Sequence, residues 1–173
     1  MAESSFTGEI YRLRASSPMP IAGGKLVLHS FGAEKNTVII YECTKSLPGS
    51  SSFLVGGIIT YSNDVKNNIL GVNKLTIAKH GAVSKETAIE MARLVRNKFG
   101  SSIGISITGI AGPDGGTDEK PVGTVFIGYA DANESTATKF IFGNDRTQNR
   151  ERAVTQSLLI LKERILKNEN ISN

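Results

Sequence analysis

The chain of 173 residues has little cysteine and little histidine: Cys43 is the lone cysteine, and His29 and His80 are the two histidines. A lone cysteine cannot form an internal disulfide, which is typical of proteins in a reducing cytoplasm. No cluster of further ligand residues surrounds either histidine in the sequence, so we expect neither a metal nor another cofactor. Cys43 acting as a nucleophile with one of the histidines is an alternative hypothesis.

The sequence also lacks long apolar runs. No stretch approaches the roughly 20 residues that a membrane-spanning helix needs. The N-terminus has no charged-then-apolar signal pattern. We therefore expect a cytoplasmic protein that has no membrane partner.

Aromatic residues are scarce, at 6% of the chain. The net charge is +4, but basic residues are interspersed with acidic ones, and we find no stacking platform or nucleic-acid motif. We therefore do not expect nucleic acid as a partner. The mildly basic charge suits an anionic small molecule such as a phosphate ester, although a solvated basic surface explains the same composition.

The sequence does contain an alternation of strand-like and helix-like segments from about residue 37 onward. Its β-branched or alternating patterns predict strands at 37–41, 53–61, 103–108, 122–129 and 135–142. Apolar residues at helical spacing, or helix start and stop signals, predict helices over 63–70, 84–99 and 147–167. We expect Asn63 as the N-cap of the first helix and Gly71 as its end, and we expect an apolar stripe of the last helix to face the core. This order indicates an α/β domain with a mixed sheet, whose ligands bind at the carboxyl ends of strands.

The first 36 residues have no clear pattern. A short helix over 10–15 and a strand over 24–31 are the elements that we expect there. We therefore divide the chain into a divergent N-terminal segment, 1–36, and a domain over 37–173.

Ser51, Tyr61 and Lys66 carry the clearest chemical signal. A hydroxyl beside an amine can cleave an amide without a metal, provided that the lysine loses its proton. Burial, and the positive end of the helix predicted over 63–70, would both lower the lysine pKa from its ordinary value of about 10.4. Taken alone, however, the serine run is typical of a turn, Lys66 of a solvated surface residue and Tyr61 of a packing residue.

A series of short motifs adds weight to the catalytic hypothesis. The motifs are Pro48–Ser51, Gly56–Asn63, Lys66, Leu70–Val72, His80–Ser84, Thr108–Pro113, Glu119–Val125 and Arg146 with Arg150. With these motifs in this order, the chain from Leu47 to about Leu161 resembles the C-terminal domain of the competence- and damage-inducible CinA family. That family includes the nicotinamide mononucleotide deamidases.

The resemblance implies an α/β/α three-layer sandwich and an amidohydrolase that converts nicotinamide mononucleotide into nicotinate mononucleotide and ammonia. It implies Ser51 as the nucleophile, Lys66 as the general base and Tyr61 as a residue that assists proton movement or holds this pair. The substrate-binding set that it implies is Ser50, Thr108, Gly109, Gly112, Arg146 and Arg150, with one of the arginines on the phosphate. It also implies a pyridine nucleotide as the partner and self-association, for which we expect a dimer.

The chain departs from the family before the Pro48–Ser51 turn. The family has an Ala-Glu-Ser-x-Thr-Gly-Gly motif there, which opens a helix that forms one wall of the pocket. Here Glu34 stands at the position of the motif serine. If residues 37–44 form the preceding strand, the helix has no room before Pro48. Because catalysis tolerates little displacement of reacting groups, the alternative is a catalytically inactive CinA-like module that binds a nucleotide or a protein.

Overall fold

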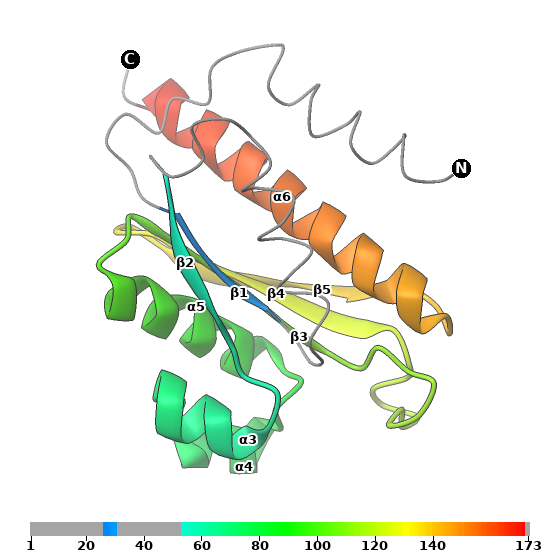
Figure 1. Cartoon of the computed structure of the whole chain (residues 1–173). Coiled ribbons are helices and arrows are strands. Elements are labelled where there is room, and N and C mark those ends of the chain that lie inside the picture. Colours follow the sequence, from blue (N-terminus) through cyan, green and yellow to red (C-terminus); the bar gives the residue numbers. More distant parts are fainter. Residues whose placement is uncertain (1–25, 31–52, 172–173) are drawn as a thin grey trace.

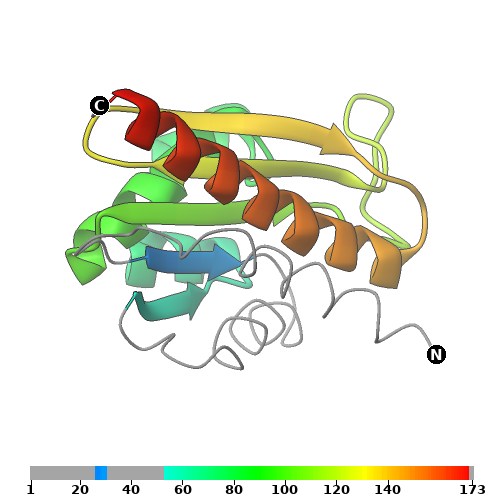
Figure 2. The ribbon, with the colours of Figure 1, turned by 90° about the horizontal axis from the view of Figure 1, so that it is seen from above.

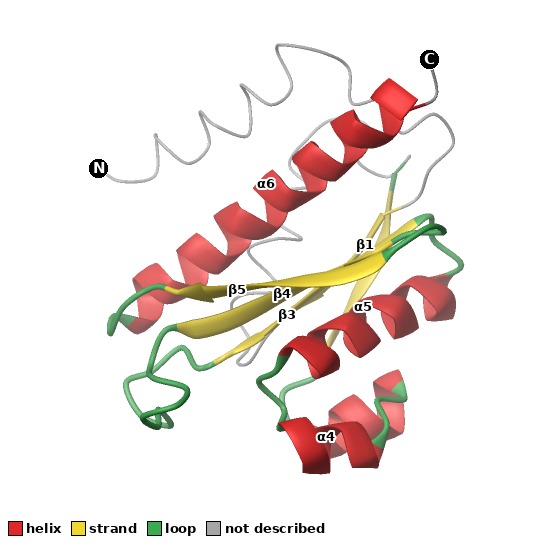
Figure 3. Cartoon of the chain, turned by 180° about the vertical axis from the view of Figure 1, so that it is seen from behind, coloured by secondary structure: helices red, strands yellow, loops and turns green. Residues whose placement is uncertain are grey.

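The computed structural model describes residues 26–30 and 53–171, which form three layers (Figure 1). A five-stranded sheet is the middle layer. Helix α6 (Arg146–Ile171) covers one face of the sheet, and α5 (Lys85–Phe99) covers the other, with α4 (Lys74–His80) beside it. Figure 3 shows the same layers from behind. The expected α/β/α sandwich is confirmed.

The strand order in the sheet is β2-β1-β3-β4-β5. The strands are β1 (Leu26–Ser30), β2 (Leu54–Ile59), β3 (Ile103–Gly109), β4 (Thr124–Ala130) and β5 (Ser135–Ile141). Strand β1 pairs in parallel with β2 and β3, whereas β3, β4 and β5 pair antiparallel, so the sheet is mixed as expected. The strand predicted at 37–41 and the helix predicted at 10–15 lie outside the described residues.

Strand β1 comes from the segment before residue 37. It lies between β2 and β3, with His29 opposite both Ile58 and Ser106. The strand expected over 24–31 is therefore confirmed. Because it separates β2 from β3, these five residues belong to the sheet that carries the rest of the domain.

Helix α5 begins and ends as its sequence signals predict. The Ser84 hydroxyl accepts a hydrogen bond from the Thr87 backbone N–H, and Gly100 ends the helix with φ at +59°. The helix packs on the small-residue face of the sheet, where a Cβ on Gly104 would lie 2.2 Å from the Ala92 carbonyl oxygen. The small residues of β3 therefore allow close contact between helix and sheet.

The other face of the sheet holds the larger core. Ile105, Ile107 and Ile127 of the sheet are almost fully buried, and Val154 and Leu161 of α6 belong to the same cluster. The inward-facing stripe predicted for the last helix is thus confirmed. None of the helices in the described part of the chain is long and apolar enough to span a bilayer.

The segment after β2 forms one turn of α-helix, α3 (Asn63–Val65), and then a π-helical turn, η2 (Lys66–Leu70). Asn63 was the expected N-cap, which is wrong by one residue: the Ser62 hydroxyl accepts the hydrogen bond from the Val65 N–H. Both residue types cap well, so the sequence does not distinguish them. Gly71, with φ at +94°, ends the segment as predicted.

The topology places several chain segments at one edge of the sheet, the edge that is formed by the ends of the strands and not by an outer strand. Because β2, β1 and β3 are parallel, their carboxyl ends lie at this edge, where β4 begins and β5 ends. Figure 2 shows that α6 also begins on this side. The sites predicted at Tyr61, Lys66, Thr108 and the loop after β3 therefore belong to one edge of the fold.

Candidate active site

Lys66 is the first residue of η2, and its side chain is buried. Its exposed fraction is 7%, and its Nζ donates a hydrogen bond of 3.0 Å to the backbone carbonyl of Thr60. Burial lowers the pKa of the Lys66 amine below its ordinary value of 10.5, because the ammonium form loses its hydration. The interpretation of Lys66 as a solvated surface lysine is therefore wrong, and a general base needs this lowered pKa.

The lowered pKa of Lys66 predicts a pH dependence of stability. Between the folded-state pKa and 10.5 the unfolded chain binds more protons at this site, so the stability of the folded protein rises with pH in that window. We expect wild type to gain stability relative to Lys66→Met as pH rises toward 10.5, by at most about 1.4 kcal/mol per pH unit. Urea unfolding at several pH values measures this difference.

Lys74→Met is the matched control, because Lys74 is exposed at the start of α4. Its stability difference from wild type should stay flat over the same pH range. A flat difference for Lys66→Met as well would contradict the burial of an amine with a lowered pKa.

Thr60 and Tyr61 lie between β2 and α3. The Thr60 side chain is 1% exposed, and its hydroxyl has no hydrogen-bond partner among the described residues. Sequence reasoning missed Thr60, although it lies two residues after the partly buried Ile58 and so on the same face of β2, which was a usable signal. The Tyr61 side chain is 68% exposed, and its role beside the Ser51–Lys66 pair stays a prediction.

Thr108 and Gly109 end β3, next to the start of β4. The Thr108 hydroxyl donates a hydrogen bond of 2.7 Å to the carbonyl of Ala82. This bond attaches β3 to the turn before α5. A Cβ on Gly109 would lie 2.6 Å from the Thr124 carbonyl oxygen, which leaves room for glycine alone at this close approach. Their contribution to a pocket stays a prediction.

Arg146 and Arg150 occupy the first turns of α6. The Arg146 guanidinium donates a hydrogen bond of 2.8 Å to the carbonyl of Gly112, the predicted loop residue, which has φ at +91°. Burial lowers the pKa of Arg150, and the positive charge of Arg146 lowers it further. Two guanidinium groups close enough to repel each other favour binding of an anion, because the anion's negative charge offsets that repulsion.

Asn149 holds the same loop and was missed by sequence reasoning. Its side chain is fully buried, and its Nδ2 donates to the carbonyls of Ala111 and Gly143 at 3.0 and 2.8 Å. The Gly143 N–H donates to Asn149 Oδ1 at 3.1 Å. The available signal was a polar residue four positions before the buried Ala153 on the apolar stripe of α6.

The edge of the sheet thus brings together a buried amine, two guanidinium groups and a glycine-rich loop. The predicted residues that the structure places there are Tyr61, Lys66, Thr108, Gly109, Gly112, Arg146 and Arg150. Ser50 and Ser51 lie outside the described residues, as does Cys43. Within the residues that the structure describes, no group of three or more His, Cys, Asp or Glu side chains forms a metal site. Chemically, a buried amine with a lowered pKa can accept a proton, and guanidinium groups can bind an anion such as a phosphate.

Known proteins are similar to this chain in both sequence and fold. The family model of the CinA C-terminal domain matches residues 39–165. A curated relative in Clostridium tetani, named for competence-damage induction, is 56% identical over 119 residues, which are 69% of this chain and 29% of the relative. A CinA-like protein of Amoebophilus asiaticus is 44% identical over 142 residues, which cover 77% of this chain and 34% of that protein. The chain therefore spans about a third or less of the length of these relatives.

Solved structures of proteins with related names have the same fold as this chain. A CinA superfamily protein of Enterobacter cloacae has a TM-score of 0.81 at 28% identity, with 92% of each chain covered. A competence or damage-inducible protein of Enterobacter asburiae has a TM-score of 0.82 at 28% identity, with 92% of this chain and 98% of that chain covered. The fold and the site define a three-layer α/β/α protein with a buried lysine at the carboxyl edge of its sheet. The chain belongs to the CinA C-terminal domain family.

Proposed function

We propose that the protein is a nicotinamide-nucleotide amidohydrolase, which converts nicotinamide mononucleotide into nicotinate mononucleotide and ammonia by a serine–lysine mechanism. The observation that supports this proposal best is the buried Lys66, whose pKa is lowered by loss of hydration. A lysine with a solvated ammonium group cannot accept a proton at neutral pH, whereas a buried amine can.

The proposed reaction has two steps that use the same base. Ser51 Oγ attacks the carboxamide carbon while Lys66 Nζ takes the hydroxyl proton and passes it to the leaving nitrogen, which departs as ammonia. Water then attacks the acyl-enzyme ester, gives a proton to Lys66, and the serine oxygen leaves with a proton from that amine. Tyr61 is the proposed assistant of these proton transfers.

The substrate phosphate is the proposed ligand of Arg146 or Arg150. Burial lowers the pKa of Arg150, and the positive charge of Arg146 lowers it further; this repulsion between the two guanidinium groups supports an anion at this point of the edge. The loop over residues 109–116 supplies backbone N–H groups at the same edge, and these groups suit an oxyanion or a phosphate. Ser50 and Thr108 complete the proposed pocket.

The direct test is release of ammonia and nicotinate mononucleotide from nicotinamide mononucleotide by the purified chain. Ser51→Ala should lower kcat/KM at least about a thousandfold, because the acyl-enzyme cannot form. Ser52→Ala, one residue along, is the control and should retain activity. A wild-type rate equal to that of Ser51→Ala would remove the enzymatic function.

A second candidate function is an inactive nucleotide-binding or protein-interaction module. The observation behind it is in the sequence: Glu34 stands at the position of the family's motif serine, and the Ala-Glu-Ser motif is absent at its spacing. This candidate predicts that nicotinamide mononucleotide raises the melting temperature without turnover. Failure of both turnover and stabilisation would leave a protein-interaction role.

A further inference from the structure

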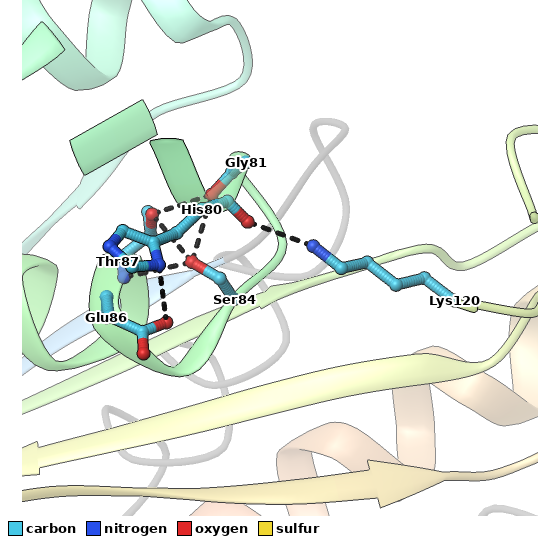
Figure 4. Close-up of polar contacts among 6 residues, drawn as sticks. All are labelled: His80, Gly81, Ser84, Glu86, Thr87 and Lys120. Atoms are coloured by element: carbon cyan, nitrogen blue, oxygen red, sulfur yellow. Dashed lines mark hydrogen bonds and ion pairs between the residues drawn. The ribbon is translucent and has the colours of Figure 1, made fainter. Parts of the chain in front are cut away.

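The turn between α4 and α5 has three successive carbonyl groups that accept hydrogen bonds from side chains. The Gly81 carbonyl accepts hydrogen bonds from the hydroxyls of Ser84 and Thr87, at 3.0 and 2.8 Å, as Figure 4 shows. The Ala82 carbonyl accepts one from the Thr108 hydroxyl of β3. The position of this turn is therefore fixed by α5 from one side and by the sheet from another.

The third carbonyl, that of His80, accepts a hydrogen bond from a distant residue. Lys120 Nζ donates to it at 2.9 Å across 40 residues of sequence (Figure 4). His80 is the last residue of α4, where unpaired carbonyls and the negative end of the helix dipole favour a cation. A hydrogen bond from a charged donor is also stronger than one between neutral groups.

Lys120 belongs to the irregular chain between β3 and β4. Its backbone is held by a tight turn, since Thr117 N–H donates to the Lys120 carbonyl at 2.9 Å and Lys120 N–H donates to the Thr117 hydroxyl at 3.1 Å. The Lys120 side chain therefore links the loop to the α4–α5 turn. Because the Lys120 backbone is itself fixed in the Thr117–Lys120 turn, this link restricts where the loop can lie.

The same loop is held at its other end from the opposite layer of the fold. Arg146 binds the carbonyl of Gly112, and Asn149 binds that of Ala111, both from α6. The exposed tip of the loop, residues 114–116, lies between these bonds and the Thr117–Lys120 turn. Lys120 thus ties to the α5 side of the sheet a loop that α6 holds from the other side.

We propose that Lys120 is a positioning residue of the candidate active site: its bond to His80 sets where the loop over residues 110–123 stands against the substrate. This inference rests on the proposed deamidase function. The Lys120 amine donates its hydrogen bond to the His80 carbonyl, so we expect its loss to act on substrate binding through the loop. The effect is therefore expected in KM, with kcat little changed.

Steady-state kinetics of Lys120→Met, beside two matched variants, tests the proposal. We expect the KM for nicotinamide mononucleotide to rise about tenfold in Lys120→Met, with kcat within about twofold of wild type. Lys120→Arg retains a charged donor and should recover most of the lost affinity. Lys79→Met removes the same charge from an exposed residue in the last turn of α4 and should leave KM unchanged.

Hydrogen exchange supplies a readout that does not depend on catalysis. Amides of residues 110–123 should exchange about tenfold faster in Lys120→Met than in wild type or Lys79→Met. If wild type shows no turnover, the proposed function fails, and the dissociation constant of nicotinamide mononucleotide replaces KM. Unchanged loop exchange in Lys120→Met overturns the positioning role, and so does faster exchange with unchanged KM and unchanged dissociation constant.

Discussion

Lys66→Met should lower kcat/KM for deamidation of nicotinamide mononucleotide by about 10²–10⁴-fold, the usual contribution of a positioned general base. Methionine is an unbranched apolar residue, shorter than lysine by one atom, that suits a buried site, but it cannot accept a proton from a serine hydroxyl. Ammonia release measured with the purified variant, beside circular dichroism to verify folding, checks this expectation.

Lys74→Met serves as the control for this variant as well, since it removes one positive charge from an exposed site and should keep wild-type activity. The wild-type rate should also fall as pH falls through the Lys66 pKa, because the ammonium form cannot act as a base. Lys66→Met that retains activity within about twofold of wild type would contradict the serine–lysine mechanism.

Gly128→Ala should destabilise the fold more than a surface substitution can. A Cβ at this position of β4 would lie 2.3 Å from the Ala88 carbonyl oxygen of α5 and 2.4 Å from the Ser106 hydroxyl oxygen. Both atoms are held in place, because Ser106 donates a hydrogen bond of 2.6 Å to that same carbonyl. We expect a loss of about 3 kcal/mol in the free energy of unfolding, since helix and strand must separate.

Gly143→Ala is the matched control for this substitution. A Cβ on Gly143 would contact the Arg152 Nη1 atom at 3.9 Å, which is an ordinary van der Waals distance. Its stability should stay within about 1 kcal/mol of wild type. Thermal unfolding of both variants compares them, and equal melting temperatures would show that the α5–sheet contact is looser than the structure indicates.

Interactions between residues close in sequence determine where several helices and strands of this fold begin and end. Ser84 and Gly100 mark the two ends of α5, because a hydroxyl caps the first N–H groups and glycine adopts a positive φ at no steric cost. The alternation of Ile103, Ile105 and Ile107 with small residues likewise predicts a strand with two different faces. These features depend on residues within a few positions of each other.

Helix α4 and the cap of α3 show where local signals were insufficient. The seven residues of α4 contribute no buried side chain, so they carry no apolar stripe that sequence reasoning can detect. Ser62 and Asn63 are adjacent residues that both favour capping, and the choice between them depends on how the chain leaves β2.

The sequence alone established the family resemblance, the α/β/α layers and the chemical types of the candidate site. Tertiary structure decided which of these groups lost water and which backbone groups they hold. Lys66 is buried in η2, an element that packs against α5, and the Lys120–His80 and Asn149–Ala111 bonds join residues 40 and 38 positions apart. Desolvation and long-range hydrogen bonds depend on the packed neighbours of a residue, which its own stretch of sequence does not specify.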